Sequence, residues 1–174
     1  MGKNGKQPLV YLAGAIENAP DSGRSWREEI SLFLEKELNQ NVFNPCLEEN
    51  HVLTPHEFRN FRKWKATDLP RFRKVVHKII ETDLTTLLKR VDYIICLWDQ
   101  YVLNGGGTHG ELTVAYLHKI PVYMVSCIPL GDMSSWVIGC TTEIFSDFDQ
   151  LKNFLLKKFE NQVAAGNILN AGKE

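Results

Sequence analysis

The sequence predicts an α/β fold: a doubly wound, roughly five-stranded and mainly parallel sheet with helices on both faces. Two apolar runs, Tyr93–Trp98 and Pro121–Val125, have the length and the β-branched and aromatic content of buried strands. The residues between them contain a loop and a helix-like pattern. Strand, helix and strand in this order form the βαβ unit of a parallel sheet. The 174 residues suffice for one domain, which we place at residues 1–163, with a frayed end over residues 164–174.

The composition is typical of a globular protein and disfavours two kinds of partner. Hydrophobic residues make up 44% and charged residues 24% of the chain, and the net charge is −1. Such a charge gives no field for a polymeric nucleic acid or a membrane surface, and no apolar run approaches the roughly 20 residues of a membrane span. The N-terminal apolar segment is too short for a secretion signal, so we expect a cytoplasmic protein.

The four cysteines do not indicate a disulfide framework or a metal site. They are far apart and mostly flanked by apolar residues, which is typical of buried, reduced thiols. Cys46, His51 and His56 are close in sequence, but their spacing matches no known metal pattern. We therefore expect no metal and no cofactor.

The first half of the chain supplies two strands and one clear helix. Leu9–Ala13 reads as a buried strand, and Asn41–Asn44 as a short strand ended by Pro45. Between them, Ser25 and Glu28 could form the capping box of a helix. Its apolar face has helical spacing: Trp26, Ile30, Phe33, Leu34 and Leu38. Residues 46–66 are polar and we expect them to be irregular.

A basic segment and a long helix follow. Eight Lys and Arg residues lie between Arg59 and Lys78, against one acid, Asp68. A solvated helical face is the ordinary explanation, and a phosphate-facing lid over a ligand site is the alternative. Thr67–Lys89 reads as one helix with Pro70 tolerated in its first turn.

Asp83 falls on the apolar stripe of that helix, four residues after Ile79 and four before Leu87. A carboxylate on the core side of a helix is costly unless it is paired or hydrogen-bonded. Asp83 therefore either caps a restart of the helix or is delivered to a pocket, where burial would tune its pKa.

The end of the chain predicts one more strand and one more helix. Ser126–Cys140 reads as a loop, and Glu143–Phe145 as a last strand. Asp147 would cap a final helix. That helix would turn five apolar residues inward: Phe148, Leu151, Phe154, Leu155 and Phe159.

The glycine-rich loop after Trp98 is the candidate ligand site. Three consecutive glycines, residues 105–107, let the backbone approach a ligand closely, and ligands of open α/β sheets bind beyond the carboxyl ends of the strands. Glu111 follows this loop, and two interpretations of its carboxylate are possible. It could complete a capping box with Thr108, or it could be a carboxylate held over the crevice as nucleophile or base. Gly110 favours the second interpretation, because a glycine in the first helical turn weakens the helix and suggests close packing.

Several short motifs together resemble the nucleoside 2-deoxyribosyltransferase family. They are the opening VYLAG, the ETDL aspartate before the central strand, the GT-x-x-E-x-x-x-A helix start and the late SSW. The resemblance runs from Leu9 to about Leu156 and weakens over residues 45–66. It implies a flavodoxin-like, Rossmann-like fold and a small-molecule nucleoside or nucleotide and a nucleobase as ligands.

The resemblance also implies three catalytic roles. Tyr11, which by itself reads as a core tyrosine, matches a first-strand tyrosine that orients the nucleophile. Asp83 matches an aspartate that hydrogen-bonds the substrate and assists protonation of the departing base. Glu111 matches the carboxylate that attacks the anomeric carbon of the sugar.

Two departures from the family pattern concern substrate binding. The family usually has an aspartate six residues before the nucleophile to hold the sugar hydroxyl, and here that position is Gly105; Asp99 or Asn104 nearby could substitute. Members also insert a polar residue from a neighbouring subunit, for which Asp132 is the closest match. We therefore expect a homo-oligomer. The other expected substrate-binding residues are Gly14, Arg24, Gly107 and Ser134.

Three functions are compatible with these residues. The first is transfer of a 2′-deoxyribosyl group between bases through a glycosyl-glutamate ester, by the logic of retaining glycosidases. The second is hydrolysis of a nucleoside 5′-monophosphate, favoured by Gly105, the basic segment and Arg24. The third is a nucleotide-sensing module without catalysis.

Overall fold

The computed structural model describes residues 6–171, with side chains described as far as residue 159. Its five strands form one sheet in the order β2-β1-β3-β4-β5, and every neighbouring pair is parallel. This order places the switch in connection direction between β1 and β3, where ligands of doubly wound sheets bind. The strands are β1 (Leu9–Ala13), β2 (Asn41–Phe43), β3 (Tyr93–Trp98), β4 (Val122–Ser126) and β5 (Glu143–Phe145).

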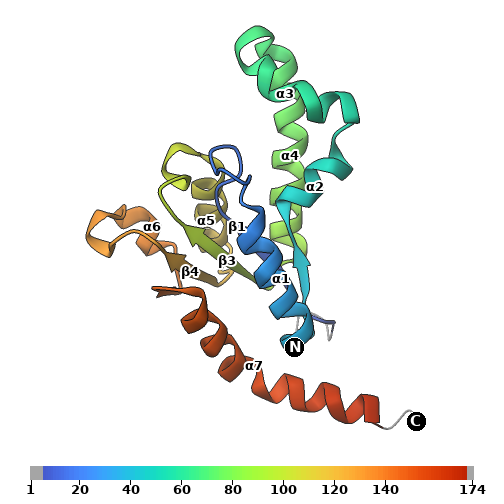
Figure 1. The fold of residues 1–174 in the computed structure, drawn as a ribbon, viewed down its shortest axis with the longest axis vertical. Coiled ribbons are helices and arrows are strands. Elements are labelled where there is room, and N and C mark those ends of the chain that lie inside the picture. Colours follow the sequence, from blue (N-terminus) through green and yellow to red (C-terminus); the bar gives the residue numbers. More distant parts are fainter. Residues whose placement is uncertain (1–5, 172–174) are drawn as a thin grey trace.

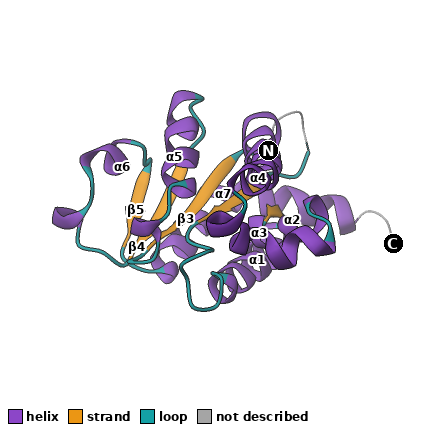
Figure 2. Ribbon diagram, turned by 90° about the horizontal axis from the view of Figure 1, so that it is seen from above, coloured by secondary structure: helices purple, strands orange, loops and turns teal. Residues whose placement is uncertain are grey.

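Helices cover both faces of the sheet, each over its own apolar core (Figure 1 and Figure 2). On one face, α1 (Arg24–Leu38) and α7 (Phe148–Ala171) pack against the alternate strand residues that include Val10 and Leu12. On the other face lie α4 (Leu69–Arg90), α5 (Gly107–Leu117) and α6 (Ser135–Gly139), against Tyr11 and its neighbours. The predicted doubly wound α/β fold is confirmed, and the described sheet is parallel throughout.

Two further helices join β2 to α4. They are α2 (Pro45–Val52) and α3 (Pro55–Thr67), and we call them together the helical hairpin. The hairpin packs on the N-terminal half of α4 around a third, smaller core that contains Leu53, Phe61 and Val75. In Figure 1 this end of α4 and the hairpin lie at the top of the view, away from α7.

The irregular structure predicted for residues 46–66 is therefore wrong. Each helix of the hairpin begins with a side-chain cap followed by proline, which is a strong local start signal. Asn44 accepts a hydrogen bond from the Cys46 amide, and Thr54 forms a capping box with Glu57. The polar composition hid these helices because they bury only a narrow apolar face.

Other local predictions have mixed outcomes. The long helix predicted over Thr67–Lys89 is confirmed within two residues, with Pro70 in its first turn. The Ser25–Glu28 capping box is not formed: Asp21 instead accepts hydrogen bonds from the Gly23 and Ser25 amides.

The second half of the chain also differs in one place from the prediction. The segment predicted as a loop over residues 126–140 contains the short helix α6. The cap at Asp147 is confirmed, since its carboxylate accepts a hydrogen bond from the Gln150 amide at 2.8 Å. The backbone of α7 is helical to Ala171, and residues 172–174 lie outside the described part of the chain. Within the described residues, no helix is long and apolar enough to cross a membrane.

Candidate active site

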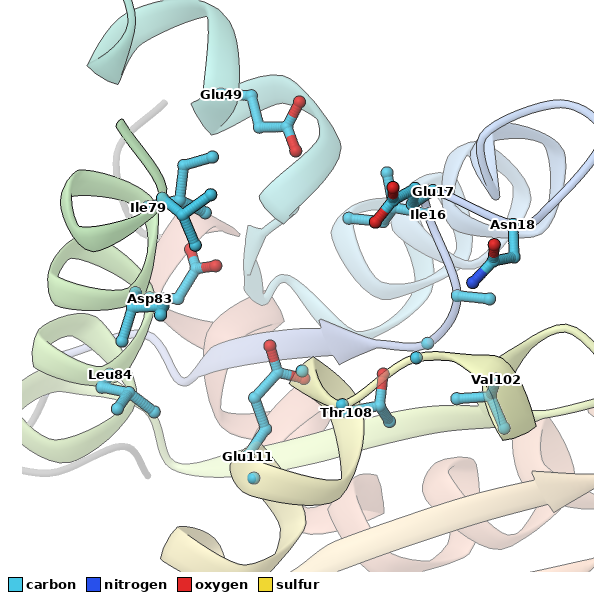
Figure 3. A pocket seen from close by; sticks show the side chains of 18 of the residues that line it. Ile16, Glu17, Asn18, Glu49, Ile79, Asp83, Leu84, Val102, Thr108 and Glu111 are labelled. Atoms are coloured by element: carbon cyan, nitrogen blue, oxygen red, sulfur yellow. The ribbon is translucent and has the colours of Figure 1, made fainter. Parts of the chain in front are cut away.

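A cavity of about 480 Å³ opens at the switch between β1 and β3, a volume in the range of small-molecule sites. The loop after β1 forms one side, α4 the opposite side, the start of α5 the floor, and the hairpin contributes the upper wall (Figure 3). Three of its acidic residues come from three different elements: Glu49 from α2, Asp83 from α4 and Glu111 from α5. The cavity therefore gathers carboxylates that lie far apart in sequence.

Glu111 is held by Tyr11 at the base of the cavity. The Tyr11 hydroxyl donates a hydrogen bond to Oε1 of Glu111 at 2.7 Å, across 100 positions of sequence. Tyr11 is fully buried within β1, so its ring also belongs to the core, where it stacks on Phe43. Burial raises the pKa of Glu111, whereas the hydrogen bond from Tyr11 and the charge of Arg27 lower it. The contact fixes one carboxylate oxygen of a residue that lines the cavity, and leaves the other without a hydrogen bond among the described residues.

The capping-box interpretation of Glu111 is wrong. Helix α5 begins at Gly107 after Gly106, and no side chain caps it. Thr108 is inside the first turn, buried, and lines the cavity. A Cβ at Gly110 would meet no heavy atom within 4 Å, so no other part of the chain packs closely against this glycine. Gly110 instead lines the cavity.

Asp83 reaches the same cavity from α4. The helix is continuous through this position, so Asp83 does not cap a restart, and its side chain points toward the space above Glu111 (Figure 3). Burial, together with the smaller effects of the nearby carboxylates of Glu111 and Glu49, raises its pKa to about 8. Asp83 is therefore poised to carry a proton at neutral pH, next to a carboxylate that can remain charged.

Arg27 supports the site from behind and was missed by the sequence prediction. Its guanidinium is fully buried and donates hydrogen bonds to four backbone carbonyls, those of Leu12, Gly14, Ala15 and Gly23. These carbonyls belong to the end of β1 and to the loop that borders the cavity. A signal existed in the sequence, because Arg27 has the helical spacing of the buried residues Ile30, Leu34 and Leu38.

The glycines expected to bind substrate lie at the cavity, and their binding to substrate stays a prediction. Gly14, Gly105 and Gly107 all line the cavity. At Gly14 the backbone has φ of 155°, and a Cβ would approach the Leu97 carbonyl to 3.2 Å, so glycine is required there.

The other expected substrate-binding residues do not line the cavity. Asp99 accepts hydrogen bonds from the Tyr101 and Val102 amides instead, and Asn104 and Arg24 are exposed outside it. Asp132 and Ser134 are exposed on the segment before α6 and are likewise absent from the cavity of their own chain. Neither Asp99 nor Asn104 thus replaces the missing aspartate at Gly105.

Other polar residues occupy the cavity that sequence reasoning did not identify. Glu17 and Asn18 come from the loop after β1, and Glu49 comes from the hairpin. Glu49 accepts two hydrogen bonds from Arg62, at 3.1 and 3.2 Å, and Glu17 pairs with Lys65 at 3.2 Å. Only tertiary structure places these residues at the site, since no motif marks them.

The basic segment is mainly a solvated surface. Seven of its eight cations are exposed and Lys78 is half-buried, which agrees with the ordinary explanation. Among the described cavity residues Arg62 is the one cation, and it is paired with Glu49. Within the described residues, no group of three or more His, Cys, Asp or Glu side chains is arranged to hold a metal ion.

Comparison with known proteins identifies the fold. One similar solved structure is the 2-deoxyribosyltransferase of the psychrotolerant bacterium Bacillus psychrosaccharolyticus, with a TM-score of 0.58 and 20% identity over 83% of this chain and 90% of that one. A second is a conserved protein from Enterococcus faecalis V583, with a TM-score of 0.58 and 15% identity over 90% and 99% of the two chains. No protein-family model and no curated protein matches the sequence. The chain therefore has the fold of a 2-deoxyribosyltransferase, as the sequence resemblance predicted.

Proposed function

We propose that the chain cleaves the N-glycosidic bond of 2′-deoxynucleosides and transfers the deoxyribosyl group to another nucleobase. The observation that carries the proposal is the contact between Tyr11 and Glu111 in a cavity that Asp83 also enters. The fold shared with a 2-deoxyribosyltransferase supports it at the level of architecture.

Each residue has a defined part in the proposed reaction. The free oxygen of Glu111 attacks C1′, the bond from C1′ to the base nitrogen breaks, and its electron pair stays on that nitrogen. Asp83 donates its proton to the departing base, which requires an acid that is neutral near pH 7. An acceptor base then attacks C1′, the ester breaks to restore the Glu111 carboxylate, and the proton of the acceptor passes to Asp83.

The oxocarbenium-like transition state favours this arrangement. Positive charge develops on the sugar as the base departs, and a carboxylate at C1′ stabilises it before bonding to it. Tyr11 keeps the carboxylate in one orientation by holding Oε1. The neighbouring Thr108 and Asn18 are placed on the cavity wall and offer hydrogen-bonding groups to the sugar hydroxyls.

The charges of the cavity favour a nucleoside over its 5′-monophosphate. Its acidic side chains are Glu17, Glu49, Asp83 and Glu111, and the one cation among the described cavity residues, Arg62, is paired with Glu49. The described cavity thus offers no unpaired cation to a phosphate dianion, and the exposed Arg24 does not line it. We therefore place the monophosphate hydrolase second.

Chromatography of reaction products tests the proposal. The protein is incubated with a 2′-deoxynucleoside and a different free base, and formation of the second nucleoside supports transfer. We expect Glu111→Gln to abolish it, whereas Glu28→Gln, which removes an exposed carboxylate of α1, retains it. Release of base without a new nucleoside would support hydrolysis instead, and binding without any release would support the sensing module.

A further inference from the structure

The cavity has an apolar half that the proposed chemistry does not use. It is formed where the helical hairpin meets the N-terminal half of α4, and its side chains are Phe61, Phe72, Val76, Ile79 and Ile80. We call these five residues the apolar subsite.

The apolar subsite continues directly from the reacting groups. Val76, Ile79 and Ile80 lie on the same face of α4 as Asp83, and all line the same cavity. With a helical rise of about 1.5 Å per residue, the subsite extends from roughly 5 Å to roughly 16 Å from Asp83 along the axis, ending at Phe72. A base that receives a proton from Asp83 would therefore point its far edge at this surface.

The subsite combines packed aromatic rings with an exposed aliphatic side chain. Phe61 and Val75 are buried in the small core of the hairpin, and the rings of Phe61 and Phe72 stack at a centroid distance of 6.4 Å. Ile80, in contrast, is 46% exposed and faces the open cavity. An exposed aliphatic side chain beside a packed aromatic pair offers apolar area that a ligand can cover.

The polar groups at the rim leave this surface apolar. The guanidinium of Arg62 lies 4.4 Å from the centroid of the Phe61 ring and is paired with Glu49, so its charge is already compensated. Among the described residues that line the cavity, no unpaired cation therefore lies beside the apolar subsite to bind an anionic substituent.

We propose that the apolar subsite binds a base that carries an apolar substituent on the edge opposite the glycosidic nitrogen. The inference rests on the proposed function, because the position of the sugar at Glu111 defines which edge of the base faces α4. It identifies the substrate class as N-glycosides of bases with an apolar substituent. Such compounds should bind more tightly than the nucleosides whose bases lack the substituent.

Calorimetry with Glu111→Gln protein, in which turnover is blocked, tests this preference. The ligands are a purine 2′-deoxynucleoside and the same compound with a hexyl chain on the distal edge of the purine. Each buried CH₂ strengthens binding about fourfold, so burial of even two predicts an affinity at least tenfold higher for the hexyl compound. We expect Ile80→Gln or Val76→Gln to reduce this advantage to threefold or less. The control Leu88→Gln alters an exposed leucine of α4 outside the cavity and keeps the advantage.

The outcomes separate the subsite from the proposed reaction. Equal or weaker binding of the hexyl compound, or an advantage that survives both glutamine substitutions, overturns the subsite. Absence of any Glu111-dependent turnover of either compound by the unsubstituted protein overturns the reaction. In that case a hexyl advantage that depends on Ile80 still supports the apolar subsite.

Discussion

Three side chains that are remote in sequence interact at the cavity through a hydrogen bond and through charge. Tyr11 holds Glu111, and the charge of Glu111 is one reason why the pKa of Asp83 rises to about 8. The two carboxyls have different surroundings: burial raises the pKa of both, but at Glu111 the hydrogen bond from Tyr11 and the charge of Arg27 act in the opposite direction.

These interactions predict a bell-shaped dependence of kcat/KM on pH. The rate falls on the alkaline side as Asp83 loses its proton, with an apparent pKa of about 8, and on the acid side as Glu111 is protonated at a pKa above its ordinary value. Initial rates of transfer between pH 4 and 10 measure both limbs.

Asp83→Asn provides the control for the alkaline limb. It should lower kcat/KM by roughly 10²–10⁴ and remove that limb from the residual rate, since asparagine does not titrate. An alkaline limb that persists in this variant would assign it to another group.

The residue-scale prediction from sequence succeeded where a side chain conflicted with its local pattern. Asp83 was noticed because a carboxylate falls on an apolar stripe, and the cavity explains it. Glu111 could not be decided locally, because a capping box and a nucleophile have the same spacing. Its role depends on Tyr11, which only the pairing of β1 with β3 and the packing of α5 bring near.

At the scale of elements, the connection from β1 to α1 depends on a single buried cation. Four carbonyls of this connection accept hydrogen bonds from Arg27, and Gly23 takes φ of 69° where a Cβ would collide with the guanidinium. The loop borders the cavity, so its conformation and that of the site are linked.

Arg27→Met should therefore affect both stability and pH dependence. Loss of the donors leaves buried carbonyls without partners, and we expect the free energy of unfolding to fall by roughly 2–5 kcal/mol. Because the charge of Arg27 lowers the pKa of Glu111, the acid limb of the rate profile should also move to higher pH. Urea denaturation and initial rates measure the two effects.

Two variants make this prediction specific. Arg27→Lys retains the charge but not the planar set of donors, so it should keep the acid limb near its original pH while losing stability. Arg24→Met removes an exposed arginine three residues away and should change stability by no more than about 0.5 kcal/mol. An acid limb that does not move in Arg27→Met would limit Arg27 to a structural role.

The elements show why the sequence prediction failed over the hairpin. The strands and the longer helices of the two main cores have continuous apolar patterns and were predicted, whereas the five-residue helix α6 was not. In α2 and α3, by contrast, Phe61 is buried together with only a few partners in a small core that is shared with α4. A periodic apolar signal is weak in such helices, and their caps at Asn44 and Thr54 are the better evidence.

At the scale of the whole molecule, the described surface retains an apolar area that concerns assembly. Leu117 is 73% and Trp136 68% exposed, on the neighbouring helices α5 and α6, and Tyr116 is exposed beside them. The same region carries Asp132 and Ser134, which do not line the cavity of their own chain. The homo-oligomer expected from the sequence, in which such residues would act on a partner, stays a prediction.

Light scattering after size-exclusion chromatography measures the mass of the assembly and tests this expectation. We predict a mass of at least twice the 19.9 kDa of one chain, and a shift toward the monomer in Trp136→Glu. Leu32→Glu alters an exposed leucine on α1, on the opposite face of the sheet, and should leave the mass unchanged. A monomer in the unsubstituted protein would end this prediction and leave Asp132 and Ser134 without a role at the site.

The buried acid at the centre of the site should also reduce the stability of the whole domain at alkaline pH. The pKa of Asp83 is about 8 in the folded protein against 3.8 as the ordinary value, so the folded state binds this proton more tightly than the unfolded state. The associated stability is fully present below about pH 4 and is lost as pH rises to about 8, above which the fold buries an anion.

Asp83→Asn keeps this position neutral at every pH and should raise Tm by roughly 10 °C or more at pH 9, with little change at pH 4. Thermal unfolding followed by circular dichroism at the two pH values checks this, with Asp132→Asn as the control that removes an exposed carboxylate. Equal gains at both pH values would mean that asparagine improves packing rather than removing a charge. A gain confined to alkaline pH, together with the loss of activity, would show that the fold gives up stability to hold the acid that the reaction needs.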